Sequence, residues 1–282
     1  MEKDKSASRP VLYFLCAVES CVFSVIRKTF YVCGRDITSL ASGKRCLVIA
    51  PHPDDEVLGC GAAIMHVRQA GQAVRIIFVT DGRHSHRSAV MSPDDIAACR
   101  EAEALKACAQ LGVDAKDVIF LRHIDGGTAQ RIDKIVADLQ KQIENFRPTC
   151  LFSPFGIDSH SDHRTVAAAV DRLERAGVVA CPVYEYPVWF WNFRVWRDAL
   201  LDLLGKDNAR PFYIHSLLRP RTIAAADCMG RKRAALAAHR SQVTNLTGEP
   251  GWQTLSPWFL RHFFGTQELF FEKLLPDKAG MP

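Results

Sequence analysis

The sequence lacks the features that mark several common classes of protein. It has no internal repeat, no low-complexity segment and no long block of basic residues, although its net charge is +5. A nucleic-acid-binding protein more often carries a basic face interleaved with aromatic side chains. We therefore predict no nucleic-acid partner, and the scattered positive charge leaves an anionic substrate open.

The ten cysteines include no CxxC pair. Most of them lie inside apolar runs, as Cys46, Cys99, Cys108 and Cys150 do. We interpret them as reduced core residues and not as a disulfide framework. This interpretation favours a cytoplasmic protein.

The apolar segment at the start of the chain, residues 11–26, is shorter than the ~20 residues that a transmembrane helix requires. Glu19 lies in its middle, and a carboxylate at the bilayer centre costs roughly 2.5–3.5 kcal/mol. We predict that residues 1–40 form an apolar or amphipathic appendage and that residues 41–282 form a single catalytic domain. Docking of the appendage on the domain or on a second subunit is favoured, while membrane association and a homo-oligomer stay open.

The rest of the chain alternates between two patterns. Apolar, β-rich runs lie at 45–50, 73–80, 117–121, 149–153 and 181–186. Helical patterns lie near 57–70, 93–111, 128–146 and 163–176. This alternation predicts an α/β fold with a Rossmann-like, mostly parallel sheet and helices on both faces. Residues 187–220 break the pattern and are interpreted as a wall built onto the sheet.

Polar side chains follow three of the predicted strands. Residues 52–56 end the first strand, Asp81 ends the second, and SPFGIDSHSDHR (153–164) follows the fourth. In open α/β sheets the functional groups gather beyond the carboxyl ends of the strands. We therefore expect these three segments to meet at one rim.

The glycines after the first strand allow a dinucleotide-binding alternative. Gly59 and Gly61 match the first two glycines of GxGxxG, but Ile64 stands at the third position, although Asp81 falls about where a ribose-binding acid would lie. The three carboxylates before them oppose this alternative, because a pyrophosphate at a helix N-terminus needs donors. The glycines are better explained by close packing of the helix on the sheet.

A divalent cation would remove the repulsion among Asp54, Asp55 and Glu56, because the ion becomes the largest local charge. The loop after the fourth strand supplies partners, since His160 and His163 flank another carboxylate there. HPDD and HSDH at neighbouring strand ends together predict a metal site.

Five segments carry a family resemblance. They are PHPDDEVLGCGAAI (51–64), VTDG (79–82), RxxEA (100–104), HSDH (160–163) and KRAALAAHRSQ (232–242). Together they resemble the zinc-dependent de-N-acetylases of the PIG-L/LmbE type over about residues 44–245. The family commonly has proline where Ser161 stands, a change that removes no ligand.

The resemblance implies a zinc ion held by His52, Asp55 and His163, with sites left open for water and substrate. Another divalent transition metal stays open as the native ion. It also implies that the reaction is hydrolysis of the acetamide of an N-acetylglucosamine-like sugar conjugate, which releases acetate and a free amine.

The resemblance further assigns three catalytic residues. Asp54 would serve as general base toward the attacking water. His160 would face the developing oxyanion, as an imidazolium that later protonates the leaving amine, and Asp162 would orient an imidazole. Glu56 has no assigned chemistry and suits the first turn of a helix in any case.

Three further residues are candidates for contacting the substrate: Asp81, Arg100 and His239. A structural role explains the first two nearly as well: Asp81 could be a turn residue, and Arg100 could form an ion pair on a helix surface. His84 and His86 lie on a long loop after the second strand, which is either a lid or a plain solvated loop.

Two other functions stay open at this point. Two histidines and one carboxylate are also the ligands of non-haem iron oxygenases, but these have no need for a free base beside the metal. A sugar-binding or scaffold protein that has lost turnover is the second, and the complete set of ligands and base argues against it.

Overall fold

The computed structural model describes residues 9–41, 44–191, 195 and 219–273. Most of the wall predicted for 187–220 lies outside these residues. The described helices are α1 (Arg9–Cys33), α2 (Asp55–Gln69), α3 (Pro93–Gln110), α4 (Ile132–Phe146), α5 (Ser161–Arg175), α8 (Met229–Ala238), α9 (Arg240–Val243) and α10 (Pro257–Leu260). The described strands are β1 (Arg35–Asp36), β2 (Cys46–Ala50), β3 (Val74–Thr80), β4 (Val118–His123), β5 (Cys150–Pro154), β6 (Val183–Tyr186), β7 (Pro220–Ala224) and β8 (Gln267–Glu272).

The described strands form one mixed sheet in the order β1-β7-β8-β6-β5-β2-β3-β4. Strand β8 runs antiparallel to its neighbours β6 and β7, while the other pairs are parallel. The five predicted strands and the four predicted helices are all present, which confirms the α/β fold with a mostly parallel sheet.

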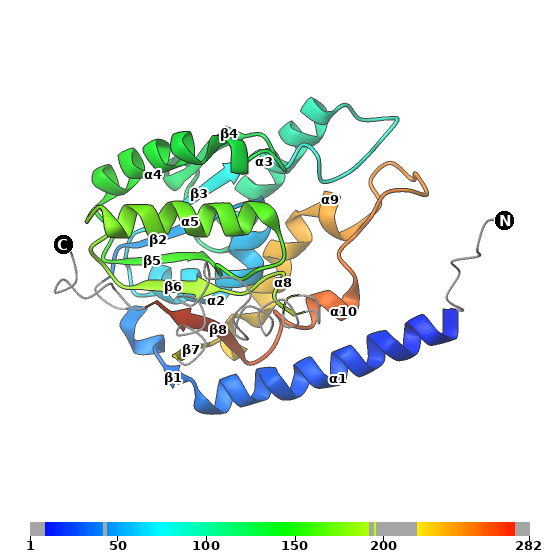
Figure 1. Cartoon of the computed structure of the whole chain (residues 1–282), viewed down its shortest axis with the longest axis horizontal. Helices are drawn as coiled ribbons and strands as arrows, with labels where there is room; N and C mark the ends of the chain where they lie inside the picture. The colour runs from blue at the N-terminus through cyan, green and yellow to red at the C-terminus, as the bar shows by residue number, and fades with distance from the viewer. Residues whose placement is uncertain (1–8, 42–43, 192–194, 196–218, 274–282) are drawn as a thin grey trace, which may run out of the picture.

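Helices cover both faces of this sheet, as Figure 1 shows. Alternation along β2 sends Leu47 and Ile49 into a core shared with α4 and α5. Val48 and Ala50 face the opposite core, to which α2, α3 and α8 contribute. Both faces of β2 are therefore buried, and its carboxyl end, where residues 51–54 begin, is held rigidly.

Helix α2 packs closely on the sheet because of one glycine. A Cβ atom built at Gly59 would lie 2.3 Å from a ring carbon of Tyr186 on β6, so no larger residue fits there. Gly61 instead faces the stem of Lys232 on α8. The predicted close packing on the sheet thus applies to Gly59. Gly61 instead allows α8 to pack closely against α2.

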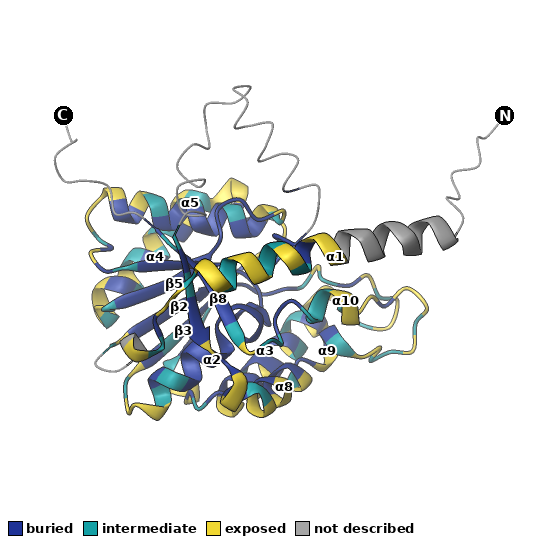
Figure 2. Cartoon of the chain, turned by 90° about the horizontal axis from the view of Figure 1, so that it is seen from below, coloured by how far each residue is buried: buried dark blue, intermediate teal, exposed yellow. Residues whose placement is uncertain are grey.

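The second half of α1 lies along the domain, and its first half extends past the rim that carries α10 (Figures 1 and 2). Phe23 is buried in the core, and the ring of Phe30 packs edge-on against Phe271 of β8. The hydroxyl of Tyr31 donates to the carbonyl of Gln267. Among the described residues, no helix is long and apolar enough to cross a membrane. The domain boundary at residue 41 stays a prediction.

Candidate active site

The predicted rim carries a cavity of about 350 Å³ at the carboxyl ends of β2, β3 and β4. Its wall combines residues from the loops after β2 to β6 with Arg100 of α3, Gln242 of α9 and the segment between α9 and α10. The lining residues are His52, Asp54, His84, Ser85, His86, Arg100, Asp125, His160, Trp189, Gln242, Gln253, Thr254 and Leu255.

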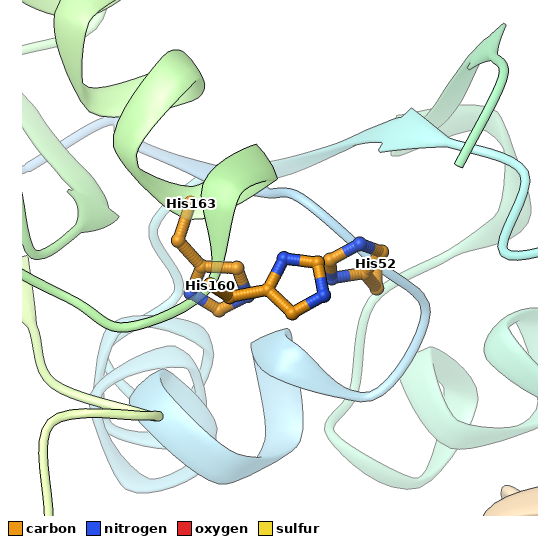
Figure 3. Close-up of side chains that lie close together, drawn as sticks. All are labelled: His52, His160 and His163. Carbon is orange, nitrogen blue, oxygen red and sulfur yellow. The ribbon is translucent and has the colours of Figure 1, made fainter. Parts of the chain in front are cut away.

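Three predicted ligands converge beside this cavity. Oδ2 of Asp55 lies 3.4 Å from Nδ1 of His52 and 3.2 Å from Nε2 of His163. His163 comes from the first turn of α5 and His52 from the loop before α2, and Figure 3 shows their rings together with that of His160. His52, His160 and His163 each offer a ring nitrogen within 4.8 Å of the others, close enough for a metal ion, and Asp55 contacts two of these three rings.

Carboxylates hold the far nitrogen of each imidazole. Nε2 of His52 lies 3.1 Å from Asp162 and 3.2 Å from Asp125, while Nδ1 of His163 lies 3.2 Å from Asp158. Such a partner fixes the tautomer and leaves the opposite nitrogen free to bind a metal. The free nitrogens here, Nδ1 of His52 and Nε2 of His163, are the two that face Asp55.

The electrostatics of this cluster favour a cation. Burial by itself lowers the pKa of His52, but hydrogen bonds with Asp125, Asp162 and Asp55 outweigh it and raise that pKa well above its usual value. Burial opposes protonation of His163 as well, yet its carboxylate neighbours raise its pKa to about 9. The site therefore attracts positive charge.

The donor set also fits zinc chemically, because two imidazoles and one carboxylate are common catalytic zinc ligands. Both ring nitrogens of His163 are buried, and neither makes a hydrogen bond of acceptable geometry with any residue that the structure describes. A metal ion between Nε2 and Asp55 would satisfy that nitrogen, while Nδ1 lies beside the carboxylate of Asp158.

Asp54 lies at the floor of the cavity in a strained conformation. Its φ of 130° and ψ of −25° are unusual for a residue with a side chain, and such values cluster at functional sites. Burial raises the pKa of its carboxyl to about 6, although the guanidinium of Arg100, 3.4 Å from Oδ2, opposes the rise. A carboxyl with this pKa can accept and release a proton near neutral pH.

His160 lines the same cavity as a neutral imidazole. Its Nδ1 accepts a hydrogen bond from the backbone N–H of Asp162 at 3.3 Å, so the ring proton is on Nε2. Burial, reinforced by the nearby rings of His52 and His163, lowers its pKa to about 4. The family resemblance implies an imidazolium at His160, whereas burial and the neighbouring rings favour a neutral N–H donor.

Asp162 is held by several hydrogen-bond donors. Its Oδ1 accepts from the hydroxyl of Thr128 at 2.6 Å, and its Oδ2 accepts from the backbone N–H of Gly126 at 2.8 Å besides meeting His52. These bonds hold the carboxylate in place behind the imidazole, in the orienting position expected for it.

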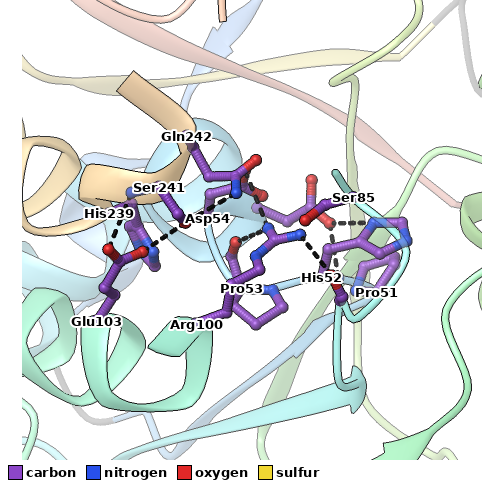
Figure 4. Close-up of polar contacts among 12 residues, drawn as sticks. Pro51, His52, Pro53, Asp54, Ser85, Arg100, Glu103, His239, Ser241 and Gln242 are labelled. Carbon is purple, nitrogen blue, oxygen red and sulfur yellow. Dashed lines mark hydrogen bonds and ion pairs between the residues drawn. The ribbon is translucent and has the colours of Figure 1, made fainter. Parts of the chain in front are cut away.

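The three substrate-contact candidates occupy different places. Arg100 lines the cavity and donates to the carbonyl of Pro53. Asp81 is paired with Arg83 at 2.7 Å and is absent from the cavity wall. His239 is fully buried behind Asp54, where its Nε2 lies 2.7 Å from Glu56. Figure 4 shows Arg100 and His239 on the two sides of Asp54.

The sequence predicts no role for Asp125 or Asp158. Asp125 follows β4, so the rule that functional groups follow strand ends would have found it. Asp158 lies within the loop after β5 that was singled out, but nothing in its spacing distinguishes a partner of His163 from a solvated side chain. The loop with His84 and His86 forms part of the cavity wall, and His86 stacks on Trp252 with ring centroids 4.1 Å apart.

Known proteins resemble this chain in sequence and fold. The PIG-L family, described as GlcNAc-PI de-N-acetylase, matches residues 47–173. The 1D-myo-inositol 2-acetamido-2-deoxy-alpha-D-glucopyranoside deacetylase of Mycobacterium sp. (strain KMS) is 26% identical over 277 residues, which cover 82% of this chain and 83% of that protein.

Two solved structures show the same fold. The N,N'-diacetylchitobiose deacetylase from Pyrococcus horikoshii superposes with a TM-score of 0.60 at 20% identity, covering 84% of this chain and 89% of that one. The deacetylase of the A40926 pseudoaglycone gives a TM-score of 0.58 at 20% identity, covering 82% and 97%. These comparisons show that residues 47–173 match the PIG-L family and that the chain has the fold of the two deacetylases.

Proposed function

We propose that this protein is a metal-dependent N-deacetylase that hydrolyses the acetamide of an N-acetylglucosamine-like sugar conjugate. The observation that carries the proposal is the contact of Asp55 with both His52 and His163, next to Asp54 with its strained backbone. Deacetylation needs both a Lewis acid and a base, and this arrangement provides for the two together.

Zinc is the proposed ion, held by His52, Asp55 and His163. When bound, it would polarise the acetamide carbonyl and acidify the attacking water. Asp158 and Asp162, each fixed by hydrogen bonds of its own, keep the two imidazoles in the tautomers that such binding requires.

Asp54 takes a proton from the attacking water in this proposal. Its carboxylate borders the cavity and forms an ion pair with Arg100. Nε2–H of His160 then donates to the oxygen of the acetamide as negative charge develops there, a role that a neutral imidazole can fill. The proton held on Asp54 becomes available to the departing amine.

The size of the cavity suits a sugar-sized ligand. A volume of about 350 Å³ lies in the ordinary range for small-ligand sites. The relatives' names point the same way, since they include a 2-acetamido-2-deoxyglucopyranoside linked to inositol and a diacetylchitobiose as substrates. The group attached to the sugar in this protein's own substrate is left open by the proposal.

The direct test is release of acetate from a panel of N-acetylated sugar conjugates, measured with and without prior chelation. We expect about one divalent ion per chain by elemental analysis, activity that chelation removes, and recovery on adding zinc. Acetate release that persists in metal-free protein would refute the metal-dependent mechanism. Metal binding without acetate release from any conjugate would favour a binding protein.

Replacement of His160 by alanine should leave the metal in place and slow turnover. The ring lines the cavity, and its Nε2–H is the donor expected to meet the oxyanion. Loss of one such donor costs about 2.7–4 kcal/mol of transition-state stabilisation, or roughly 10²–10³ in kcat. Measurement of kcat and KM beside metal content checks this. Near-normal turnover at saturating substrate, or loss of the metal, would contradict the role.

A further inference from the structure

Two residues without a role in the chemistry above meet directly behind Asp54. Oε2 of Glu56 accepts a hydrogen bond from the backbone N–H of Asp54 at 2.9 Å. Its other oxygen, Oε1, lies 2.7 Å from Nε2 of His239, 183 residues further along the chain. Both side chains are fully buried, and neither lines the cavity. Contact between this pair and a substrate is therefore excluded in this conformation.

The backbone that Glu56 holds is the strained one. A non-glycine residue at a φ of 130° costs on the order of 1–3 kcal/mol and persists only where its surroundings fix it. The carbonyl of Asp54 accepts from the N–H groups of Val57 and Leu58 at 3.1 and 3.0 Å, so the first turn of α2 fixes one side of the residue. The carboxylate of Glu56 fixes the other side, at the N–H.

His239 is itself fixed by its position between α8 and α9. Two residues later, Ser241 donates from its N–H and its hydroxyl to Glu103 on α3, at 2.8 and 2.6 Å. Helix α3 also carries Arg100, whose guanidinium reaches Oδ2 of Asp54. One short segment, residues 239–241, thus contacts Glu56, which holds the backbone of Asp54, and also helix α3, which carries the Arg100 paired with the carboxylate of Asp54.

We propose that Glu56 and His239 form a positioning pair that holds Asp54 in its strained conformation, with the carboxylate directed at the cavity. The inference rests on the proposed function, in which Asp54 is the base. A pair that only stabilised the fold would affect folding, metal binding and substrate binding together. A positioning pair affects chiefly kcat, because the geometry of proton transfer suffers first when the base shifts.

The test compares two substitutions of His239 in the full-length protein. His239→Leu fills the space without a donor, whereas His239→Gln retains an N–H group that can reach Glu56. We expect His239→Leu to lower kcat by about 10–100-fold, the scale of a 1 Å misplacement. Its KM and its metal content should stay within about two-fold of wild type, and His239→Gln should recover most of kcat.

His123→Leu is the matched control. His123 is also buried and pairs with a carboxylate, Asp138, at 3.1 Å, but neither residue contacts Asp54 or lines the cavity. Its kcat should stay near that of wild type. If His239→Leu does not fold, Glu56→Asp provides the second variant. It keeps the charge but is too short to reach both Asp54 and His239, and it should show the same selective loss of kcat.

Crystal structures of the variants give a readout independent of activity. In His239→Leu or Glu56→Asp we expect φ of Asp54 to leave the positive region, or its carboxylate to turn from the cavity. An unmoved Asp54 with unchanged kcat would overturn the inference, and so would parallel losses of kcat, KM and metal that His239→Gln fails to rescue. Absence of acetate release from the wild-type protein would refute the proposed function instead, and the crystal comparison would still test the positioning.

Discussion

Substitution of Asp55 by alanine is expected to remove metal binding and deacetylation together. Oδ2 of Asp55 is the carboxylate oxygen that Nδ1 of His52 and Nε2 of His163 both approach, so its removal takes away the proposed anionic ligand between them. The carboxylate is also the charge that chiefly offsets burial of His163. Without it, two buried imidazoles face each other, and affinity for a divalent ion should fall below detection in elemental analysis.

Loss of fold must be distinguished from loss of metal in this experiment. The carboxylate also accepts from the N–H of His52 at 2.9 Å, and an orphaned buried donor costs about 1–3 kcal/mol. Asp55→Asn keeps an oxygen for that N–H and should still lose the ion, since an amide is a weaker ligand than a carboxylate. Asp138→Ala, which removes a histidine-paired carboxylate outside the cavity, should keep both metal and activity. An active, metal-loaded Asp55→Ala protein would overturn the assignment.

The parts of the fold that the sequence predicted are those with a strong local signal. Strands β2 to β6 and helices α2 to α5 were predicted from apolar periodicity and turn residues, because both of these depend on local conformation. The antiparallel strand β8 was not predicted, because its six residues, QELFFE, contain no turn signal that pairs them with β6 or β7. The pairing of β8 arises from tertiary contacts that a local pattern does not contain.

The residues of the candidate site also differ in how far the sequence predicts them. Asp54, Asp55 and the two ligand histidines lie in short motifs, whose spacing alone indicates a metal site. Asp125 and Asp158 act from behind the imidazoles, through single contacts that impose no spacing. The contact between His239 and Glu56 joins segments 183 residues apart, so only the folded structure reveals it. The proposed ligands and Asp162 lie in local motifs and could be predicted, whereas the contacts of Asp158 with His163 and of His239 with Glu56 required the folded structure.

Substitution of Asp54 by asparagine should separate catalysis from metal binding. The amide side chain has nearly the same shape as the carboxylate, and asparagine tolerates positive φ better than most residues, so the fold and the ion should remain. The amide cannot accept the proton of the attacking water, and kcat should fall by about 10²–10⁴, the usual contribution of general acid–base catalysis. Metal content, kcat and KM of the purified variant check this. Loss of the ion from the Asp54→Asn protein, with retention in Asp55→Ala, would reverse the roles of the two residues.

The pH dependence of the wild-type protein supplies the second half of this prediction. Burial raises the pKa of Asp54 to about 6, against the opposing effect of Arg100. Because the base must be ionised to accept a proton, activity should be lost as pH falls through the pKa and should be full above it. A bound cation beside Asp55 favours the ionised form and moves this limb to lower pH. In Asp54→Asn the residual activity should no longer show the acidic limb that belongs to Asp54. Persistence of an identical limb in the variant would assign it to another group and leave Asp54 without the role of base.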